Sequence, residues 1–400
     1  MQTRFPEPVR ASAQGAAVEQ NVRKCVHCGF CNVTCPTFQL RRDELDGPRG
    51  RIYQIKQAIE TGVVAPSLQT HLDRCLTCRA CETTCPAGVQ YAQVLDFGRS
   101  LAEAVPRPVG QRLLRRALRW ALPHRRRFAA LLRLGRLVKP LLPPRLRDGI
   151  PPSRAAGAWP TAQHDRRMLL LAGCVHDTLD PPTNAAAARV LDRLGISLQA
   201  VPGAGCCGAI SHHLSAEAQA RAFMRRNIDA WWPHIEAGAE AVVVPASGCG
   251  VQVKDYGRLL ADDPAYAERA LRIAGLTRDL AEVLAGETLT PAPGVPRRIA
   301  FQSPCTLQHG QRLGGAVEAL LRRAGFELLP VADGHLCCGA AGTYALTQPA
   351  LSQPLRERKL QALLAGGPQL IATANIGCQT HLQARAPIPV RHWIELFDPQ

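Results

Sequence analysis

Short apolar runs alternate with longer stretches of helical periodicity through the second half of the chain. The apolar runs are residues 168–171, 241–244, 299–301 (after Arg298) and 370–372. Apolar residues three and four positions apart, the spacing of an amphipathic helix, occur over residues 184–194, 215–230, 316–324 and 353–364. Because buried strands that alternate with helices are typical of α/β units, this half is predicted to be α/β structure.

The first hundred residues carry a helical pattern and no pattern typical of strands. Ile52, Ile55 and Ile59 recur at i, i+3 and i+7, which predicts a helix in the middle of this region. We therefore expect an N-terminal α-helical domain over residues 1–104.

A basic segment rich in proline follows at residues 105–165. Between Arg107 and Arg147 it holds 13 Lys and Arg residues and no Asp or Glu, out of a net charge of +16 for the whole chain. An amphipathic helix of about three turns is predicted inside it. Its basic face is Arg112, Arg115, Arg116 and Arg119, and its apolar face is Leu114, Leu118, Ala121 and Leu122. Helix-breaking prolines follow at Pro123, Pro140, Pro143 and Pro144.

Two runs of four cysteines have the spacing C-x2-C-x2-C-x3-C and are each followed by proline. The first run is Cys25, Cys28, Cys31 and Cys35, and the second is Cys75, Cys78, Cys81 and Cys85. This spacing is typical of ferredoxins, in which the fourth cysteine of a run binds the cluster of the other run. The runs predict two [4Fe–4S] clusters with crossed ligands. Cluster one is assigned to Cys25, Cys28, Cys31 and Cys85, and cluster two to Cys75, Cys78, Cys81 and Cys35. Structural zinc is the alternative, but such sites normally use two separated C-x2-C pairs.

Two further sets of four cysteines repeat each other in the α/β half. They are Cys174, Cys206, Cys207 and Cys249, followed by Cys305, Cys337, Cys338 and Cys378. In each set 31 residues separate the first cysteine from an adjacent pair that is followed by glycine. Either set is a candidate third metal site, and three interpretations stay open: an additional iron–sulfur cluster, zinc, or a redox-active thiol set. A fourth interpretation is that these cysteines are buried and bind no metal.

The repeated cysteines and strands indicate a duplication. The fold class predicted is α/β, with an N-terminal α-helical ferredoxin-like domain and a C-terminal duplicated α/β cysteine-rich domain. The two Cys-Cys-Gly units are expected at residues 166–290 and 291–400, after the linker at 105–165.

Composition limits the setting in which these cysteines work. The chain of 400 residues has 16 cysteines, and its N-terminus shows no apolar segment of a secretory signal, so the thiols are expected to be reduced and cytoplasmic. No apolar run of about 18 residues is present, so no transmembrane helix is expected. Because the charge outside the linker is nearly balanced, nucleic acid is not expected as a partner. The linker itself is expected to rest on an anionic membrane surface or an acidic partner subunit, unless it is simply a solvated segment.

The motifs together resemble the iron–sulfur subunit of glycolate oxidase. The resemblance rests on the two four-cysteine runs, the segment Asp46-Gly47-Pro48-Arg49-Gly50-Arg51-Ile52 between them, and the two Cys…Cys-Cys-Gly…Cys units. It implies an electron-transfer subunit of an oxidoreductase complex that acts on the CH-OH group of a 2-hydroxy acid and is not catalytic alone. The implied partners are an FAD-containing catalytic subunit that oxidises glycolate to glyoxylate, a second flavoprotein-like subunit, and a quinone or other membrane acceptor. The implied location is cytoplasmic, peripheral on the inner face of the cell membrane.

Related families give the alternative functions. The chain is more distantly similar to iron–sulfur subunits of lactate and glycerol-3-phosphate dehydrogenase complexes, and to heterodisulfide reductase subunits that act on thiols and disulfides. In heterodisulfide reductase the unit ends in C-x2-C, which helps to hold a noncubane cluster. Here Ala246 and Asn375 stand three residues before Cys249 and Cys378. Each unit therefore has four cysteines, and the cofactor of the second domain stays open.

Overall fold

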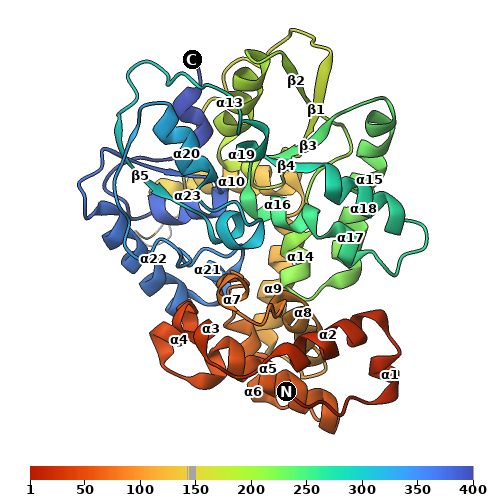
Figure 1. The fold of residues 1–400 in the computed structure, drawn as a ribbon. Helices are drawn as coiled ribbons and strands as arrows, with labels where there is room; N and C mark the ends of the chain where they lie inside the picture. The colour runs from red at the N-terminus through yellow and green to blue at the C-terminus, as the bar shows by residue number, and fades with distance from the viewer. Residues whose placement is uncertain (142, 144–149, 400) are drawn as a thin grey trace. The chain divides into compact units, whose positions relative to one another are not determined.

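The computed structural model describes residues 1–141, 143 and 150–399, and it divides the chain into two compact units (Figure 1). The first unit is Met1–Leu114 together with Asp333–Lys359. The second unit is Arg115–Ala332 together with Leu360–Gln400. Seven residues of the predicted basic linker, 142 and 144–149, lie outside the described residues, and they include Pro144, Arg145 and Arg147.

The N-terminal part of the first unit is helical. Its helices are α1 Glu7–Arg10, α2 Ala13–Lys24, α3 Phe30–Val33, α4 Pro36–Arg41, η1 Glu44–Asp46, α5 Pro48–Thr61, α6 Pro66–Asp73, α7 Ala80–Thr84 and α8 Tyr91–Ala102. The predicted helix between the cysteine runs is α5, which buries Ile52, Ile55 and Ile59 against α6 and α8. The helix ends at Gly62, which has a φ of 70°. This left-handed conformation favours glycine, because a side chain with a Cβ would be strained there. Among the described residues this part forms no strand, as the sequence predicts.

Two short elements near residue 350 complete the first unit. They are α21 Tyr344–Thr347 and the part of α22, Pro349–Leu364, that ends at Lys359. The loop before them carries Cys337, Cys338 and Gly339.

The basic linker is largely helical. Its elements are α9 Val109–Ala121, α10 Arg125–Val138 and the single turn η2 Lys139–Leu141. The predicted amphipathic helix is α9, and it ends before Pro123; of its residues only Leu118 is fully buried. Helix α10 was not predicted, and none of its residues is buried. Within the described ranges, none of the helices has both the length and the apolar character that a membrane crossing requires.

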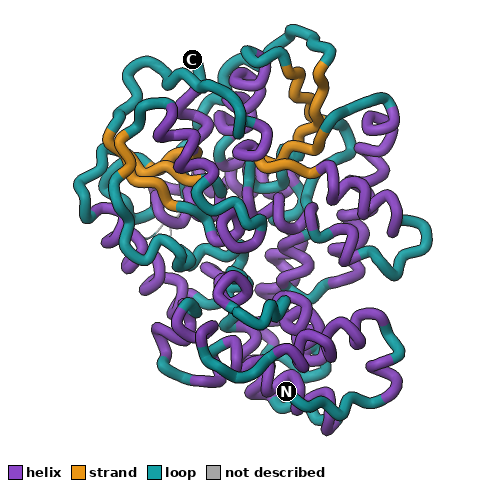
Figure 2. The backbone as a smooth tube through the Cα atoms, in the orientation of Figure 1, coloured by secondary structure: helices purple, strands orange, loops and turns teal. Residues whose placement is uncertain are grey.

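Two four-stranded parallel sheets of the same topology form the second unit (Figure 2). The first sheet has the order β2-β1-β3-β4, from β1 Arg166–Leu170, β2 Ile196–Ala200, β3 Ala241–Val244 and β4 Thr277–Asp279. The second has the order β6-β5-β7-β8, from β5 Arg298–Gln302, β6 Glu327–Leu328, β7 Leu370–Thr373 and β8 Val390–His392. The predicted apolar runs are the central strands β1, β3, β5 and β7, and β3 and β7 are buried along their whole length.

Helices connect the strands in both sheets, as parallel pairing requires. Around the first sheet they are α12 His176–Leu179, α13 Pro181–Asp192, α14 Ala209–His213, α15 Glu217–Glu236, α16 Ser247–Lys254, α17 Tyr256–Leu259, α18 Ala267–Leu276 and α19 Leu280–Val283. Around the second they are η3 Thr306–Gly310, α20 Ala316–Arg323, α22, α23 Ile376–Gln383 and η4 Trp393–Phe397. Because parallel strands end at one edge of a sheet, Cys174 after β1 and Cys249 after β3 follow neighbouring carboxyl ends. Cys305 after β5 and Cys378 after β7 do the same in the second sheet.

Candidate metal centres

The two ferredoxin-type runs fold into the same local structure. In the first run, Cys25 follows α2, Cys31 lies in α3, and Cys35 is the N-cap of α4. His27 and Gly29 have φ values of 57° and 85°, which turn the loop around Cys28. Left-handed backbone is costly for a residue with a Cβ and is typical of functional sites.

The second run repeats this turn without a glycine. Cys75 follows α6, Cys81 lies in α7, and Thr77 and Arg79 have φ values of 54° and 60°. Cys85 is the C-cap of α7, and Pro86 continues the chain away from it. The equal spacing of the two runs thus corresponds to equal backbone geometry.

The runs surround two cavities, and the fourth cysteine of each run faces the cavity of the other. One cavity is lined by Cys25, Cys28, Cys31 and Cys85. The other is lined by Cys35, Cys75, Cys78 and Cys81. Cys81 also lines the first cavity, so the two are adjacent. The structure therefore brings together the two sets of four thiols assigned from the sequence.

The surroundings of both cavities suit an anionic metal–thiolate cluster. The remaining lining residues include Arg49 at the first cavity and Arg51 and Arg79 at the second, and neither lining includes Asp or Glu. Burial, and after it the charge of neighbouring cysteines, raises the pKa of the thiols of Cys25 and Cys81 and brings the pKa of Cys31 to about 11. Cysteine sulfurs bind iron as thiolates, and four of them line each cavity, so each set fits a [4Fe–4S] cluster.

Arg51 is a fully buried positive charge beside the second cavity. Its guanidinium donates hydrogen bonds to the carbonyl of His71 at 2.8 Å and to the hydroxyl of Thr37 at 3.2 Å. Burial opposes its charge, but negative charge on Cys75, Tyr91, Cys35 and Asp46 raises the pKa of Arg51 above its ordinary value. A fixed cation there stabilises thiolates and the reduced form of a cluster. From the sequence, Arg51 was identified only as part of the motif between the two cysteine runs and was not predicted to lie beside a cluster cavity.

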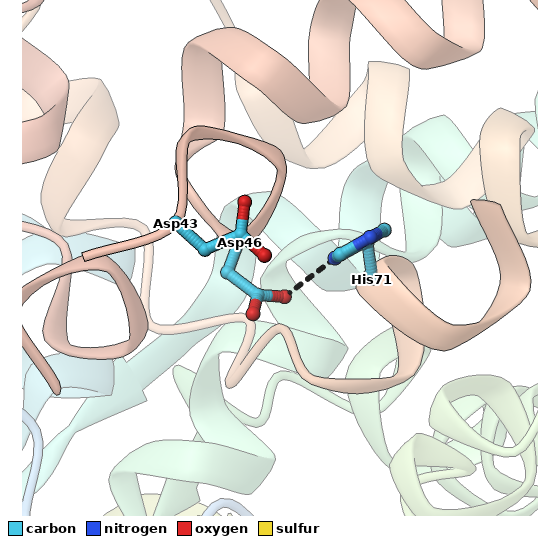
Figure 3. A group of neighbouring side chains, drawn as sticks. All are labelled: Asp43, Asp46 and His71. Carbon is cyan, nitrogen blue, oxygen red and sulfur yellow. Dashed lines mark hydrogen bonds and ion pairs between the residues drawn. The ribbon is translucent and has the colours of Figure 1, made fainter. Parts of the chain in front are cut away.

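Asp43, Asp46 and His71 form a group that is compact enough to hold a metal ion (Figure 3). Asp46 is buried, and its carboxylate instead accepts from His71 Nδ1 at 2.8 Å and pairs with three arginines. These are Arg41 at 2.5 Å, Arg74 at 3.0 Å and Arg51 at 3.6 Å. Although burial favours the neutral acid, the hydrogen bond with His71 and these cations lower the pKa of Asp46. The group is therefore an ion-pair network that fixes Arg51 and the segments carrying the cysteine runs.

The first Cys-Cys-Gly set converges into one group of sulfurs. Side-chain hydrogen bonds join Cys174 to Cys206, Cys206 to Cys207, and Cys207 to Cys249. The pKa of Cys206 is held well below its ordinary value. The main causes are the hydrogen bonds with Cys174 and Cys207, followed by the N–H of Gly208 and the charge of Arg226. The same bonds, with burial, raise the pKa of Cys174 and Cys207. Four cysteine sulfurs joined by one chain of hydrogen bonds are a suitable ligand set for iron or zinc.

The glycine after each cysteine pair has a steric reason. Gly208 and Gly339 have φ values of 90° and 91°. A Cβ at Gly208 would lie 3.0 Å from the carbonyl oxygen of Ala220, and one at Gly339 would lie 2.6 Å from that of Ser352. Each glycine N–H also points to the sulfur two residues back, at 3.4 Å from Cys206 and 3.5 Å from Cys337.

The second Cys-Cys-Gly set is divided between the compact units. Cys337 and Cys338 belong to the first unit, and Cys305 and Cys378 belong to the second. Asn375, which stands where a fifth cysteine would make a C-x2-C pair, donates from Nδ2 to the sulfur of Cys378 at 3.5 Å. The role of this set as a ligand group stays a prediction.

Comparisons with known proteins agree with this organisation. A family model described as a 4Fe-4S dicluster domain matches residues 21–89, and one described as a cysteine-rich domain matches residues 168–254 and 299–383. The "Glycolate oxidase iron-sulfur subunit" of Escherichia coli (strain K12) is 52% identical over 401 residues, covering 100% of this chain and 98% of the relative.

More distant relatives also match this chain. The "Probable glycolate oxidase iron-sulfur subunit" of Bacillus subtilis (strain 168) is 30% identical, covering 90% of this chain and 88% of the relative. The "Lactate utilization protein A" of Bacillus licheniformis is 27% identical, covering 58% of this chain and 99% of that protein. The last matches only part of this chain.

Proposed function

The chain belongs to the family of glycolate oxidase iron–sulfur subunits, and from this membership we propose that it is the electron-transfer subunit of a complex that oxidises glycolate. The observation that carries the proposal is the pair of adjacent cavities, each lined by cysteines from both runs. The full-length likeness to the Escherichia coli subunit supports glycolate over other 2-hydroxy acids. The lactate-related protein, which covers 58% of this chain, supports the wider class of 2-hydroxy acids as the alternative.

The residues of this chain hold and tune the two centres. When bound, a [4Fe–4S] cluster supplies a one-electron donor and acceptor. Cys25, Cys28, Cys31 and Cys85 would hold one cluster, and Cys35, Cys75, Cys78 and Cys81 the other. Arg49 and Arg51 supply positive charge at the cavity walls, which favours thiolates and a reduced cluster there. Adjacent cavities allow an electron to pass between the two sets.

The substrate chemistry is assigned to partner subunits. An FAD-containing subunit would oxidise glycolate to glyoxylate, a second flavoprotein-like subunit would assist it, and a quinone or another membrane acceptor would receive the electrons. To test this division, the anaerobically purified chain is assayed for glycolate oxidation with an artificial electron acceptor, alone and with the flavoprotein. We expect turnover only with the flavoprotein, and turnover by this chain alone would contradict the proposal.

A third metal centre is proposed at Cys174, Cys206, Cys207 and Cys249. Hydrogen bonds link the four sulfurs, and the pKa of Cys206 is lowered while those of Cys174 and Cys207 are raised. This pattern supports four cysteines that share negative charge around one metal centre. Two cubanes require about eight irons and eight sulfides per chain. Metal and sulfide analysis should find iron above eight, or zinc, in the native chain and lose that excess in Cys206→Ser. An unchanged metal content in that variant would remove the third centre.

The basic linker is proposed to bind the inner face of the cell membrane, so that the chain is cytoplasmic and peripheral. On α10 and the following turn, Leu134, Leu137 and Leu141 are 57%, 78% and 86% exposed. Exposed arginines lie among them at Arg126, Arg127 and Arg133. Arg127 also covers the exposed ring of Trp120 at 5.1 Å. Leucine and tryptophan beside arginine, without acidic residues, match an anionic lipid surface.

A further inference from the structure

The loop of the first cysteine run exposes large apolar side chains. Val26, Phe30 and Val33 are 70%, 57% and 69% exposed. Phe30 and Val33 are the first and last residues of α3, and their spacing of three places them on one face of that helix. Neither of these two residues is part of the lining of the adjacent cavity. Their side chains are therefore available to a partner and are not needed to enclose a cluster.

The second run has the same spacing but does not expose such side chains. The residues at the equivalent positions are Leu76, Ala80 and Thr83. Leu76 and Ala80 are buried, and Thr83 is polar. Because the two loops have the same backbone geometry, holding a cluster does not by itself require exposed apolar residues. The exposed residues of the first run therefore serve another purpose than cluster binding.

An exposed aromatic ring and an exposed cluster ligand lie in the same region. Tyr53 of α5 is exposed, and the centre of its ring is 6.2 Å from that of His27 in the loop. Cys28 is exposed, whereas its counterpart Cys78 is only partly exposed. Grouped exposed apolar residues are typical of binding surfaces, and aromatic residues are enriched in protein interfaces. We call the following set the apolar face of the first run: Val26, Phe30, Val33 and Tyr53.

Two basic side chains beside the apolar face are not neutralised. Lys24 directly precedes the loop, and Arg42 caps α4, which packs against α3. Both are exposed, and neither side chain forms a hydrogen bond or ion pair with any residue that the structure describes. Acidic residues on an incoming surface would complement them. The apolar face thus fits a protein whose docking surface is apolar at its centre and acidic at its rim.

Charges beside the two cavities indicate which cluster receives electrons first. Arg49 at the first cavity pairs with Glu44, at 2.6 Å from Nε and 3.0 Å from Nη2. Arg51 at the second cavity is fully buried, and its acidic partner Asp46, at 3.6 Å, also pairs with two other arginines. The N-terminal ammonium contacts the first loop as well, but it belongs to a half-exposed residue. Positive charge is therefore less offset at the second cavity, which favours a reduced cluster there. Electrons are expected to enter at the first cluster and pass to the second.

We propose that the apolar face of the first run docks the FAD-containing subunit, which delivers its electrons to the first cluster past the exposed Cys28. The reduced flavin loses two electrons, one at a time, each of the two clusters gains one, and the protons of the flavin pass to water. Because a lipid surface supplies no electrons, a protein partner suits a face that surrounds a cluster ligand. The inference rests on the proposed function, since it requires the flavoprotein and a cluster at the first cavity.

Two measurements test the inference: binding of the cluster-loaded chain to the purified FAD-containing subunit, and the anaerobic rate at which glycolate then reduces the clusters. In the double variant Phe30→Ser, Val33→Ser we expect binding to be weaker by tenfold or more and reduction at limiting flavoprotein to be slower in proportion. Iron content and reduction by dithionite should stay native, because neither residue lines the cavity. Val63→Ser is the matched control, since Val63 is 68% exposed in the same compact unit but lies outside the run. This control should bind and be reduced like the native chain.

Native binding and native reduction rates in the double variant would overturn the inference. It would also be overturned if that variant were reduced normally by glycolate but no longer passed electrons to a water-soluble quinone, because the face would then serve the acceptor. Loss of self-association or of vesicle binding alone would assign the face to a second copy or to lipid and would equally contradict it.

A second variant covers the case in which Phe30→Ser, Val33→Ser does not assemble its clusters. Lys24→Glu, Arg42→Glu should slow association with the flavoprotein and reduce the dependence of the association rate on salt. Unchanged association of this variant would then reject the docking surface. If the native chain binds the flavoprotein but glycolate does not reduce its clusters, the result contradicts the proposed function and not the docking surface.

Discussion

Cys35 and Cys85 end their own runs, yet each lines the cavity formed by the other run. Cys35→Ser should therefore remove the cluster at Cys75, Cys78 and Cys81 and preserve the other. Cys28→Ser is the matched control, because it should remove the cluster of its own run. Electron paramagnetic resonance spectra and iron content separate the two variants. Loss of the same signal from both would show that the ligands are not crossed.

Gly208 combines a positive φ with a close backbone neighbour, and Gly195 allows the two effects to be separated. Gly195 has a φ of 70° with nothing within 4 Å of an added Cβ, whereas a Cβ at Gly208 would lie 3.0 Å from the Ala220 oxygen. Gly195→Ala should cost about 1 kcal/mol from backbone strain. Gly208→Ala should cost more and should lower metal retention at the neighbouring cysteines. Melting temperatures compare the two, and equal losses would mean that the close contact is unimportant.

Residue spacing predicted two sets of four among the eight ferredoxin-type cysteines. The linings of the two cavities follow these sets, with Cys81 at both cavities, and the ligand assignment itself stays a prediction. Arg51 and Tyr344 could not be assigned in the same way. Arg51 lies within the periodic pattern of α5, and Tyr344 reaches Arg74 across 270 positions. Their roles depend on tertiary contacts that leave no local pattern.

At the scale of elements, the sequence predicted central strands and missed edge strands. β3 and β7 are continuous apolar runs because both faces are buried. β6 has two residues and β4 has three, with exposed polar positions, so neither has a distinct pattern. Helix α10 carries Phe128, Leu131 and Leu132 at the spacing of an apolar helix face but buries none of its residues, and it was not predicted from this spacing.

The exposed face of α10 gives a prediction for membrane binding. The double variant Leu134→Ser, Leu137→Ser should reduce flotation with anionic vesicles by tenfold or more, because each buried leucine contributes about 2 kcal/mol. Leu271→Ser is the control, since Leu271 is 68% exposed but lies on α18. High salt should also weaken binding of the native chain. Equal flotation of all variants, or none at low salt, would exclude this surface and leave an acidic partner subunit as its ligand.

At the scale of the whole molecule, the duplication and the helical N-terminal domain were predicted from repeated cysteine spacing and periodicity. The two sheets confirm the α/β fold class with their identical strand orders. The grouping of residues 333–359 with the N-terminal part could not be predicted, because the matching spacing of the two Cys-Cys-Gly units suggests equivalence. That grouping depends on contacts that the second Cys-Cys-Gly unit makes with the N-terminal part, such as the hydrogen bond from Tyr344 to the carbonyl of Arg74.

The central claim is that this chain carries electrons from glycolate through two [4Fe–4S] clusters. The most direct test adds glycolate anaerobically to the intact complex and quantifies the spins by electron paramagnetic resonance. We predict two reduced-cluster signals, about two spins per chain at full reduction. Each should be lost selectively in Cys28→Ser or Cys35→Ser. Reduction of the flavin without any iron–sulfur signal would contradict the account.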